Sequence, residues 1–175
     1  MEITARSTCT AVAVSLLLAA LAACAPLDPV AEKAEIELVI NNSIGWALTK
    51  DTVMLYDCLA HDSTFFIYHP SAQATVIGWE PFTRIVHESW MDPAFRATRF
   101  AVKDLRINLS GSGKVAWYSA LLDDFGEWQG QPAGWENARW TGVLEKRDGR
   151  WVITQMHFSF AVEQIRAEEE EAAEG

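Results

Sequence analysis

The dipeptide Asp148-Gly149 is the feature that most constrains how this chain folds. It separates two runs rich in apolar residues, and Asp-Gly in that setting is the strongest short-range signal for a two-residue β-hairpin turn. Such a turn fixes the pairing of the flanking strands, so Trp140 is expected opposite His157. Because side chains on a strand alternate between faces, Trp140, Gln155 and His157 are predicted to share one face of the sheet.

This shared face is predicted to be concave and to line a pocket. Indole rings and aliphatic side chains supply apolar walls, and Gly142 leaves empty volume directly opposite Gln155. A polar group with aromatic walls around a space is typical of sites that bind small molecules. The other face is nearly as apolar, so a homodimer interface or a reversed assignment stays open. A bulge between Thr154 and Phe158 would also turn the later side chains over.

Helical periodicity precedes the extended runs along the chain. Apolar positions at helical spacing predict a long helix from Ile36 to Ala47, a second that begins at Asp51 and a third at Glu80-Pro81. Helices followed by antiparallel strands predict an α+β fold, one domain with its helices on one face of one sheet. The expected strands are residues 64–69, 95–109, 114–123, 135–146 and 150–160, with a glycine-rich loop at 125–134.

An apolar run over residues 11–23 precedes the domain. It is too short to span a bilayer and is typical of a secretory signal peptide. Its end, Leu21-Ala22-Ala23-Cys24, resembles the lipobox of bacterial lipoproteins, which implies cleavage before Cys24 and lipid on that residue. An ordinary cleaved signal peptide is the alternative. Ala25, by the same resemblance, is compatible with sorting to the outer membrane.

These observations divide the chain and predict its location. The protein is expected to be exported and lipid-anchored in a bacterial cell envelope, on the periplasmic side of the outer membrane. The predicted segments are a signal peptide (1–23), the lipidated Cys24 with a tether (24–30), the folded domain (31–161) and an acidic tail without assigned function (162–175).

Composition excludes several classes of protein. The formal net charge of -10 repels phosphate backbones, so no nucleic-acid partner is expected. The sequence contains no HExxH or CxxC motif and no phosphate-binding glycine loop, so no metal and no cofactor are predicted. Once Cys9 leaves with the signal peptide and Cys24 carries lipid, Cys58 has no partner for a disulfide and is expected to be buried.

Three stretches together resemble a known family: DGRWVITQMHFS, the preceding RWTGVLEKRDG, and GWEPFTRIVHESW. They are similar to the SnoaL-like branch of the nuclear transport factor 2-like superfamily, and Gly78 with Trp90 also resembles the association domain of calcium/calmodulin-dependent kinases. The resemblance implies a cone, in which a curved antiparallel sheet wraps around the long helix. Two pocket arginines of the kinase domain correspond to Gly142 and Phe158 here, which puts a carboxylate-binding pocket in doubt.

The candidate chemistry centres on His157. Its imidazole is interpreted either as a general base or hydrogen-bond donor in the pocket, or as a core histidine stacked on Trp140. One of the adjacent residues Asp123 and Asp124 is its candidate acid/base partner, with Asp123 taken first, although carboxylates at strand ends are more often solvated. His69 is assigned to a turn. The predicted pocket residues are Tyr68, Trp90, Trp117, Trp140, Gln155 and His157.

Three hypotheses about function follow, because members of the resembled family include isomerases, dehydratases, cyclases, epoxide hydrolases and non-catalytic domains. The first is a lipid-anchored domain that binds a small, largely apolar molecule. The second is an isomerase- or dehydratase-type enzyme that uses His157 with an aspartate. The third is a non-catalytic assembly or partner-binding module, in which the outer sheet face forms a homodimer. Trp128 in the glycine-rich loop is interpreted as part of a lid or of a partner surface.

Overall fold

The computed structural model of the chain describes residues 28–163 and 165–166. The predicted signal peptide, Cys24, most of the tether and the acidic run that follows Arg166 lie outside these residues. Among the helices within the described part, none is long and apolar enough to cross a membrane.

The predicted long helix is α2 (Pro29–Gly45), which begins at Pro29 rather than near Ile36 and so includes the end of the predicted tether. The Asp28 carboxylate accepts hydrogen bonds from the backbone N–H groups of Val30 and Ala31, and Pro29 occupies the first turn, where its missing N–H costs nothing. The helix buries Ile36, Ile40 and Ser43 against the sheet. A short 3-10 helix, η1 (Trp46–Leu48), continues from its end.

Two shorter helices follow. Helix α3 (Thr52–Asp57) begins where Asp51 accepts a 3.0 Å hydrogen bond from the N–H of Met54, as its N-cap pattern predicts. Helix α4 (Trp79–Ile85) runs directly into a π-helical turn, η3 (Val86–Trp90). Such turns are rare and are found frequently at functional sites.

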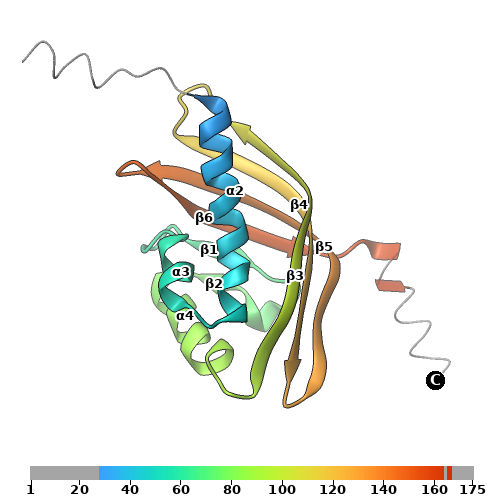
Figure 1. The fold of residues 1–175 in the computed structure, drawn as a ribbon. Helices are drawn as coiled ribbons and strands as arrows, with labels where there is room; N and C mark the ends of the chain where they lie inside the picture. The colour runs from blue at the N-terminus through green and yellow to red at the C-terminus, as the bar shows by residue number, and fades with distance from the viewer. Residues whose placement is uncertain (1–27, 164, 167–175) are drawn as a thin grey trace, which may run out of the picture.

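One six-stranded sheet packs around α2, and α3 and α4 lie beside one end of that helix (Figure 1). The strand order is β2-β1-β6-β5-β4-β3, with β1 parallel to β6 and all other pairs antiparallel. The sheet is therefore mixed, not wholly antiparallel as the sequence predicted. The strands are β1 (Phe66–Tyr68), β2 (Val76–Ile77), β3 (Phe95–Leu109), β4 (Val115–Trp128), β5 (Gln131–Arg147) and β6 (Arg150–Ser159).

The predicted glycine-rich loop is instead the tip of a long hairpin. Strand β4 continues to Trp128 and β5 begins at Gln131, so only Gln129 and Gly130 form the turn, with φ of 51° and 79°. Positive φ at both central residues is the geometry that matches the twist of the flanking strands. Trp128 is therefore a strand residue at the hairpin end and not part of a mobile loop.

The closing hairpin confirms the predicted turn but not the predicted register beyond Leu144. Lys146 pairs with Trp151 and Leu144 with Ile153, yet Val143 pairs with Gln155. Thr154 is therefore an extra residue in β6, a bulge that reverses the faces of all later side chains. The prediction that Gln155 and His157 face the helices together with Trp140 is wrong for this reason.

Close packing between α2 and the sheet requires a glycine at position 142 of β5. A Cβ on Gly142 would lie 2.5 Å from the Tyr118 ring and 2.6 Å from the Gln155 carbonyl oxygen. The volume that Gly142 leaves is thus filled by the buried Tyr118 side chain and is not part of a pocket. Cys58 is buried as expected, and burial raises the pKa of its thiol to about 12.

Candidate functional site

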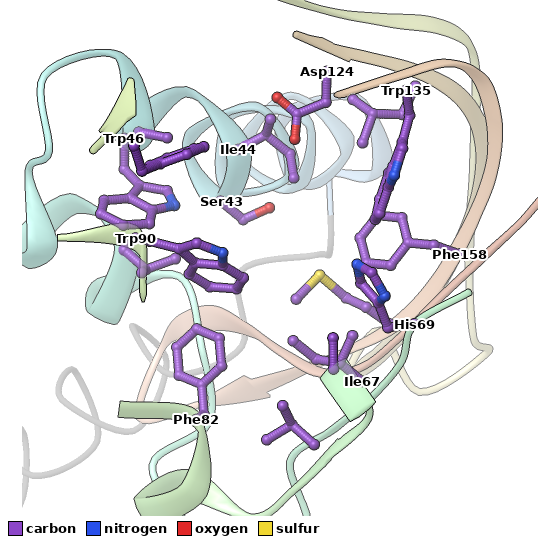
Figure 2. Close-up of a pocket in the computed structure, with 17 residues that line it drawn as sticks. Ser43, Ile44, Trp46, Ile67, His69, Phe82, Trp90, Asp124, Trp135 and Phe158 are labelled. Atoms are coloured by element: carbon purple, nitrogen blue, oxygen red, sulfur yellow. The ribbon is translucent and has the colours of Figure 1, made fainter. Parts of the chain in front are cut away.

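A cavity of about 170 Å³ lies between the helices and the concave, inner face of the sheet (Figure 2). Its floor and walls come from the end of α2, from η1, α3 and the α4–η3 segment, and from residues in or beside all six strands. The lining is predominantly apolar and aromatic, as is usual for sites that hold small organic molecules. The lining residues are Ser43, Ile44, Trp46, Ala47, Leu55, Ile67, His69, Ala74, Val76, Phe82, Trp90, Phe95, Leu122, Asp124, Trp135, Met156 and Phe158.

The helical wall consists largely of aromatic rings. Trp46 and Trp90 contact each other with ring centroids 6.2 Å apart, and Phe82 lies 5.9 Å from Trp90. Trp90 is the last residue of the π-helical turn, and Trp46 opens the 3-10 helix after α2. Two irregular helix ends therefore place the two indoles side by side at the cavity (Figure 2).

The sheet wall depends on the bulge at Thr154. Beyond this residue Met156 and Phe158 face inward and line the cavity, in the place predicted for Gln155 and His157. Trp135 of β5 contacts Phe158 with ring centroids 5.4 Å apart. Figure 2 shows the Trp135 indole nearly edge-on, so one face of the ring is turned toward the Trp46 and Trp90 side.

Asp124 contributes the carboxylate of the cavity. Its side chain lies between the helical wall and Trp135 (Figure 2), and no described residue gives it a hydrogen bond or an ion pair. Burial raises the pKa of Asp124 from 3.8 to about 6, because apolar surroundings disfavour the charged form. A carboxyl group that titrates near neutral pH is suited to proton transfer.

Asp123, the predicted catalytic aspartate, does not line the cavity. Its carboxylate accepts hydrogen bonds from the Asn137 backbone N–H at 2.8 Å and from Lys103 Nζ at 2.6 Å, and together these lower its pKa. Asn137 has a φ of 53° and belongs to a bulge that sets Trp135 opposite Asp124. Asp123 therefore stabilises the bulge that shapes the site.

His69 is the second titratable group in the lining. Its Nδ1 accepts a 3.0 Å hydrogen bond from the Ser71 backbone N–H, so the neutral ring carries its proton on Nε2. The imidazole lies 4.7 Å from the Trp135 ring, between centroids. Burial lowers the pKa of His69, which keeps the ring uncharged near neutral pH.

Two of the tryptophans predicted to form the pocket are on the concave side. Trp90 lies in the cavity wall. Trp140 is fully buried behind the lining, where it stacks on Phe158 with ring centroids 5.6 Å apart and an interplanar angle of 13°. Trp140 therefore supports the wall without forming its surface.

The other predicted pocket residues lie on the convex face, the side of the sheet away from α2. Tyr68 and Trp117 are 53% and 47% exposed. Gln155 and His157 are turned to the same side by the bulge, and the His157 ring meets Tyr68 edge-on with centroids 6.1 Å apart. His157 and Asp123 are thus outside the cavity, and the expected acid/base pair is not assembled by these two residues.

The sequence analysis takes Asp123 first as the acid/base residue and assigns His69 to a turn, although the spacing of Asp124 and His69 from apolar residues indicates that both face inward. Asp124 lies two positions after the buried Leu122, and His69 lies two positions after the buried Ile67. Alternation along a strand therefore turns both polar side chains to the inner face. Among the described residues, no group of His, Cys, Asp or Glu side chains could hold a metal ion.

The curved mixed sheet, the central helix and the cavity between them define an α+β domain of the cone-shaped class. Comparison with protein families identifies the class more closely: the model of the SnoaL-like domain matches residues 36–163. The chain therefore belongs to the SnoaL-like domain family. No curated protein matches it in sequence.

Solved structures with low sequence identity share the fold. An NTF2-like protein from Cytophaga hutchinsonii is 15% identical, with 77% of this chain and 100% of that chain covered and a TM-score of 0.60. A "putative dehydratase from the NTF2-like family" of Streptomyces avermitilis is 13% identical, with 77% and 99% covered and a TM-score of 0.64. The association domain of C. elegans CaMKII is 18% identical, with 74% and 96% covered and a TM-score of 0.56.

Proposed function

We propose that this protein binds a small, largely apolar molecule in its cavity, and that lipid on Cys24 holds it in the bacterial cell envelope. The observation that carries the proposal is the cavity of about 170 Å³, walled by aromatic and aliphatic side chains. A protein cavity of about 150 Å³ accepts benzene, so a ligand of roughly one ring fits this volume. Asp124 and His69 then supply the polar contacts that orient the ligand.

Filling the cavity tests this binding function. Ala47→Leu adds three carbons to the lining, whereas Ala34→Leu makes the same change on the exposed side of α2. Benzene is the probe, and ring-current shifts of the Met156 methyl signal report its binding. We expect binding in the wild type and in Ala34→Leu, and at least about tenfold weaker binding in Ala47→Leu. Benzene binding that is undiminished in Ala47→Leu would contradict the assignment of binding to this cavity.

A second candidate function is acid/base catalysis, which the environments of Asp124 and His69 favour. In the dehydration of a β-hydroxyketone, the Asp124 carboxylate would take the proton next to the carbonyl group. The neutral His69 Nε2–H would donate a hydrogen bond to the carbonyl oxygen, and the proton on Asp124 would then pass to the departing hydroxyl group, so that water and an enone are formed and the carboxylate is regenerated. The dehydratase name of the Streptomyces avermitilis protein supports this reaction class for the fold.

Substitutions at Asp124, His69 and His157 distinguish this catalytic function from binding alone. The probe is 3-hydroxycyclohexanone, whose dehydration product absorbs in the ultraviolet. We expect Asp124→Asn and His69→Gln to lower the rate by about a hundredfold or more, and His157→Gln on the convex face to leave it unchanged. Loss of activity in His157→Gln, or none in His69→Gln, would contradict the assignment.

The proposed lipid anchor has its own test. Cys24→Ser removes the thiol that would carry the lipid, so the expected outcome is loss of the protein from the membrane fraction. Cys58→Ser changes a buried thiol of the domain and serves as the control. A Cys24→Ser protein that stays in the membrane fraction would show that the anchor is not lipid on this residue.

A further inference from the structure

The chemistry of the cavity lining narrows the class of ligand. Large aromatic side chains stand on both sides of the space: Trp46, Trp90 and Phe82 on the helical wall, Trp135 and Phe158 on the sheet wall (Figure 2). The face of an aromatic ring carries partial negative charge and attracts cations. Trp135 turns one ring face across the space toward the helical wall (Figure 2), which favours a positively charged group between the two walls.

Among the described lining residues Asp124 is the one carboxylate, and its negative charge also favours a cation. Asp124 carries negative charge when it is ionised, and among the described lining residues there is neither a lysine nor an arginine to neutralise it. A buried carboxylate without a partner is unfavourable, and a cation placed beside it relieves that cost. A neutral ligand would instead leave the carboxylate uncompensated or require its protonation.

We propose that the ligand of this cavity is a small organic cation, an alkyl- or arylammonium ion held between the aromatic walls beside Asp124. This inference rests on the proposed binding function and specifies the ligand for the same cavity. The apolar substituents of such an ion contact the aliphatic and aromatic lining, and its charge pairs with the Asp124 carboxylate. A bound cation would also lower the pKa of Asp124, which would keep this residue ionised and unsuited to donating a proton.

The other charged groups around the cavity do not oppose a cation. His69 faces the same space but stays neutral near neutral pH, because burial lowers its pKa. The Lys50 ammonium group lies 5.9 Å from the centroid of the Phe95 ring, and it donates to the Asp92 carbonyl oxygen outside the lining. Asp123 is directed away and is paired with Lys103.

Choline and 3,3-dimethylbutan-1-ol form a matched pair of probes, since they differ in a charged nitrogen replaced by carbon. Titration at pH 8, followed by calorimetry and by tryptophan fluorescence, is expected to show choline bound at least about tenfold more tightly than the alcohol. Lowering the pH to 5 protonates Asp124, so the affinity for choline should fall while the affinity for the alcohol does not.

Variants assign the preference to named groups. Asp124→Asn should reduce the choline preference to about threefold or less and abolish its pH dependence, whereas Asp57→Asn, which removes an exposed carboxylate of α3, should change neither. Trp135→Leu should weaken choline binding more than alcohol binding.

The outcomes separate the two proposals. Equal affinities for both probes at pH 8, or an undiminished choline preference in Asp124→Asn, would overturn the cation proposal and leave the binding function standing. If neither these probes nor benzene bind to the folded wild type, the binding function fails and the cation proposal fails with it.

Discussion

Two adjacent residues, Asp123 and Asp124, show how strongly the face of a strand decides the chemistry of a side chain. The Asp123 carboxylate is directed away from the cavity and has two donors, whereas Asp124 is directed inward and has no partner among the described residues. Their pKa values shift in opposite directions, downward for Asp123 and up to about 6 for Asp124. The same residue type therefore stabilises the fold at one position and opposes it at the next.

Replacement of Asp124 by Asn is expected to stabilise the protein at neutral pH. The pKa of Asp124 is raised on folding. Its contribution to the free energy of unfolding is therefore fully present below about pH 4, where the carboxyl group is protonated, and is lost as the pH rises through about 6. Asp124→Asn should therefore raise the free energy of unfolding at pH 8, by at most about 3 kcal/mol, with a smaller gain at pH 4.5. Urea denaturation at the two pH values measures the difference.

Asp123→Asn provides the contrast of opposite sign. The pKa of Asp123 is lowered on folding, so its stabilisation is present above the pKa of the unfolded chain and is lost as the pH falls through the folded value. The variant should be destabilised at pH 8, and the loss of stability should shrink under acidic conditions.

For Asp124→Asn, a lower free energy of unfolding than that of the wild type at pH 8 would contradict the absence of a partner for the Asp124 carboxylate.

Gly142 is a position where any side chain is costly. An added Cβ would meet the Tyr118 ring at 2.5 Å and the Gln155 carbonyl oxygen at 2.6 Å, and the backbone atom cannot move without disturbing β6. Gly142→Ala is expected to lower the free energy of unfolding by about 1–3 kcal/mol. The same change at Gly111, where an added Cβ meets nothing within 4 Å, is the control. Equal stability of the two variants would contradict the tight contact.

At the scale of elements, the turn and the helix cap could be predicted from the sequence, whereas the strand register changed by a bulge could not. Asp148-Gly149 and the Asp51 cap are where expected, because their backbone requirements are local. The bulge at Thr154 has no such mark, since no glycine or proline accompanies it. The predicted positions of Gln155 and His157 depended on that register, so the fold was predictable while these two side chains were placed on the wrong face.

Helix α2 is joined to the closing hairpin by one partly buried cluster. Glu32 accepts hydrogen bonds at 2.6 Å from Lys146 Nζ and from Trp151 Nε1, and these bonds lower its pKa. Glu32→Gln is expected to lower the free energy of unfolding by about 1–2 kcal/mol at pH 7. Glu37→Gln, on the exposed side of the same helix, is the control.

The pH dependence of this cluster has a defined sign. Because the pKa of Glu32 is lowered on folding, its contribution is present above the ordinary value of 4.5 and is lost as the pH falls through the folded value. The difference between the wild type and Glu32→Gln, measured by chemical denaturation, should therefore shrink at acidic pH. A difference that stays constant down to pH 3 would mean that the charge of Glu32 is not what joins the elements.

For the whole molecule, the convex face is where self-association would occur. Trp117 and Tyr68 are exposed there, and Trp117 pairs across β4 and β5 with the half-buried Val143. We expect a homodimer through this face, so that Trp117→Glu shifts the sedimentation coefficient toward that of the monomer. Glu substituted for the exposed Leu48, on the helical side, should leave it unchanged. A wild type that sediments as a monomer at millimolar concentration would contradict this expectation.

The long edge of the sheet is formed by β3, which pairs only with β4 among the described strands, and the opposite edge is the two-residue strand β2. Register shifts interrupt β3 between Ala97 and Arg99 and between Lys103 and Arg106, and Asp104 has a φ of 52°. Bulges and cationic side chains on this edge strand disfavour its pairing with β3 of a second molecule, because amyloid-like stacking requires a flat and uninterrupted strand. Many molecules can therefore be packed close together without fibrils growing from β3.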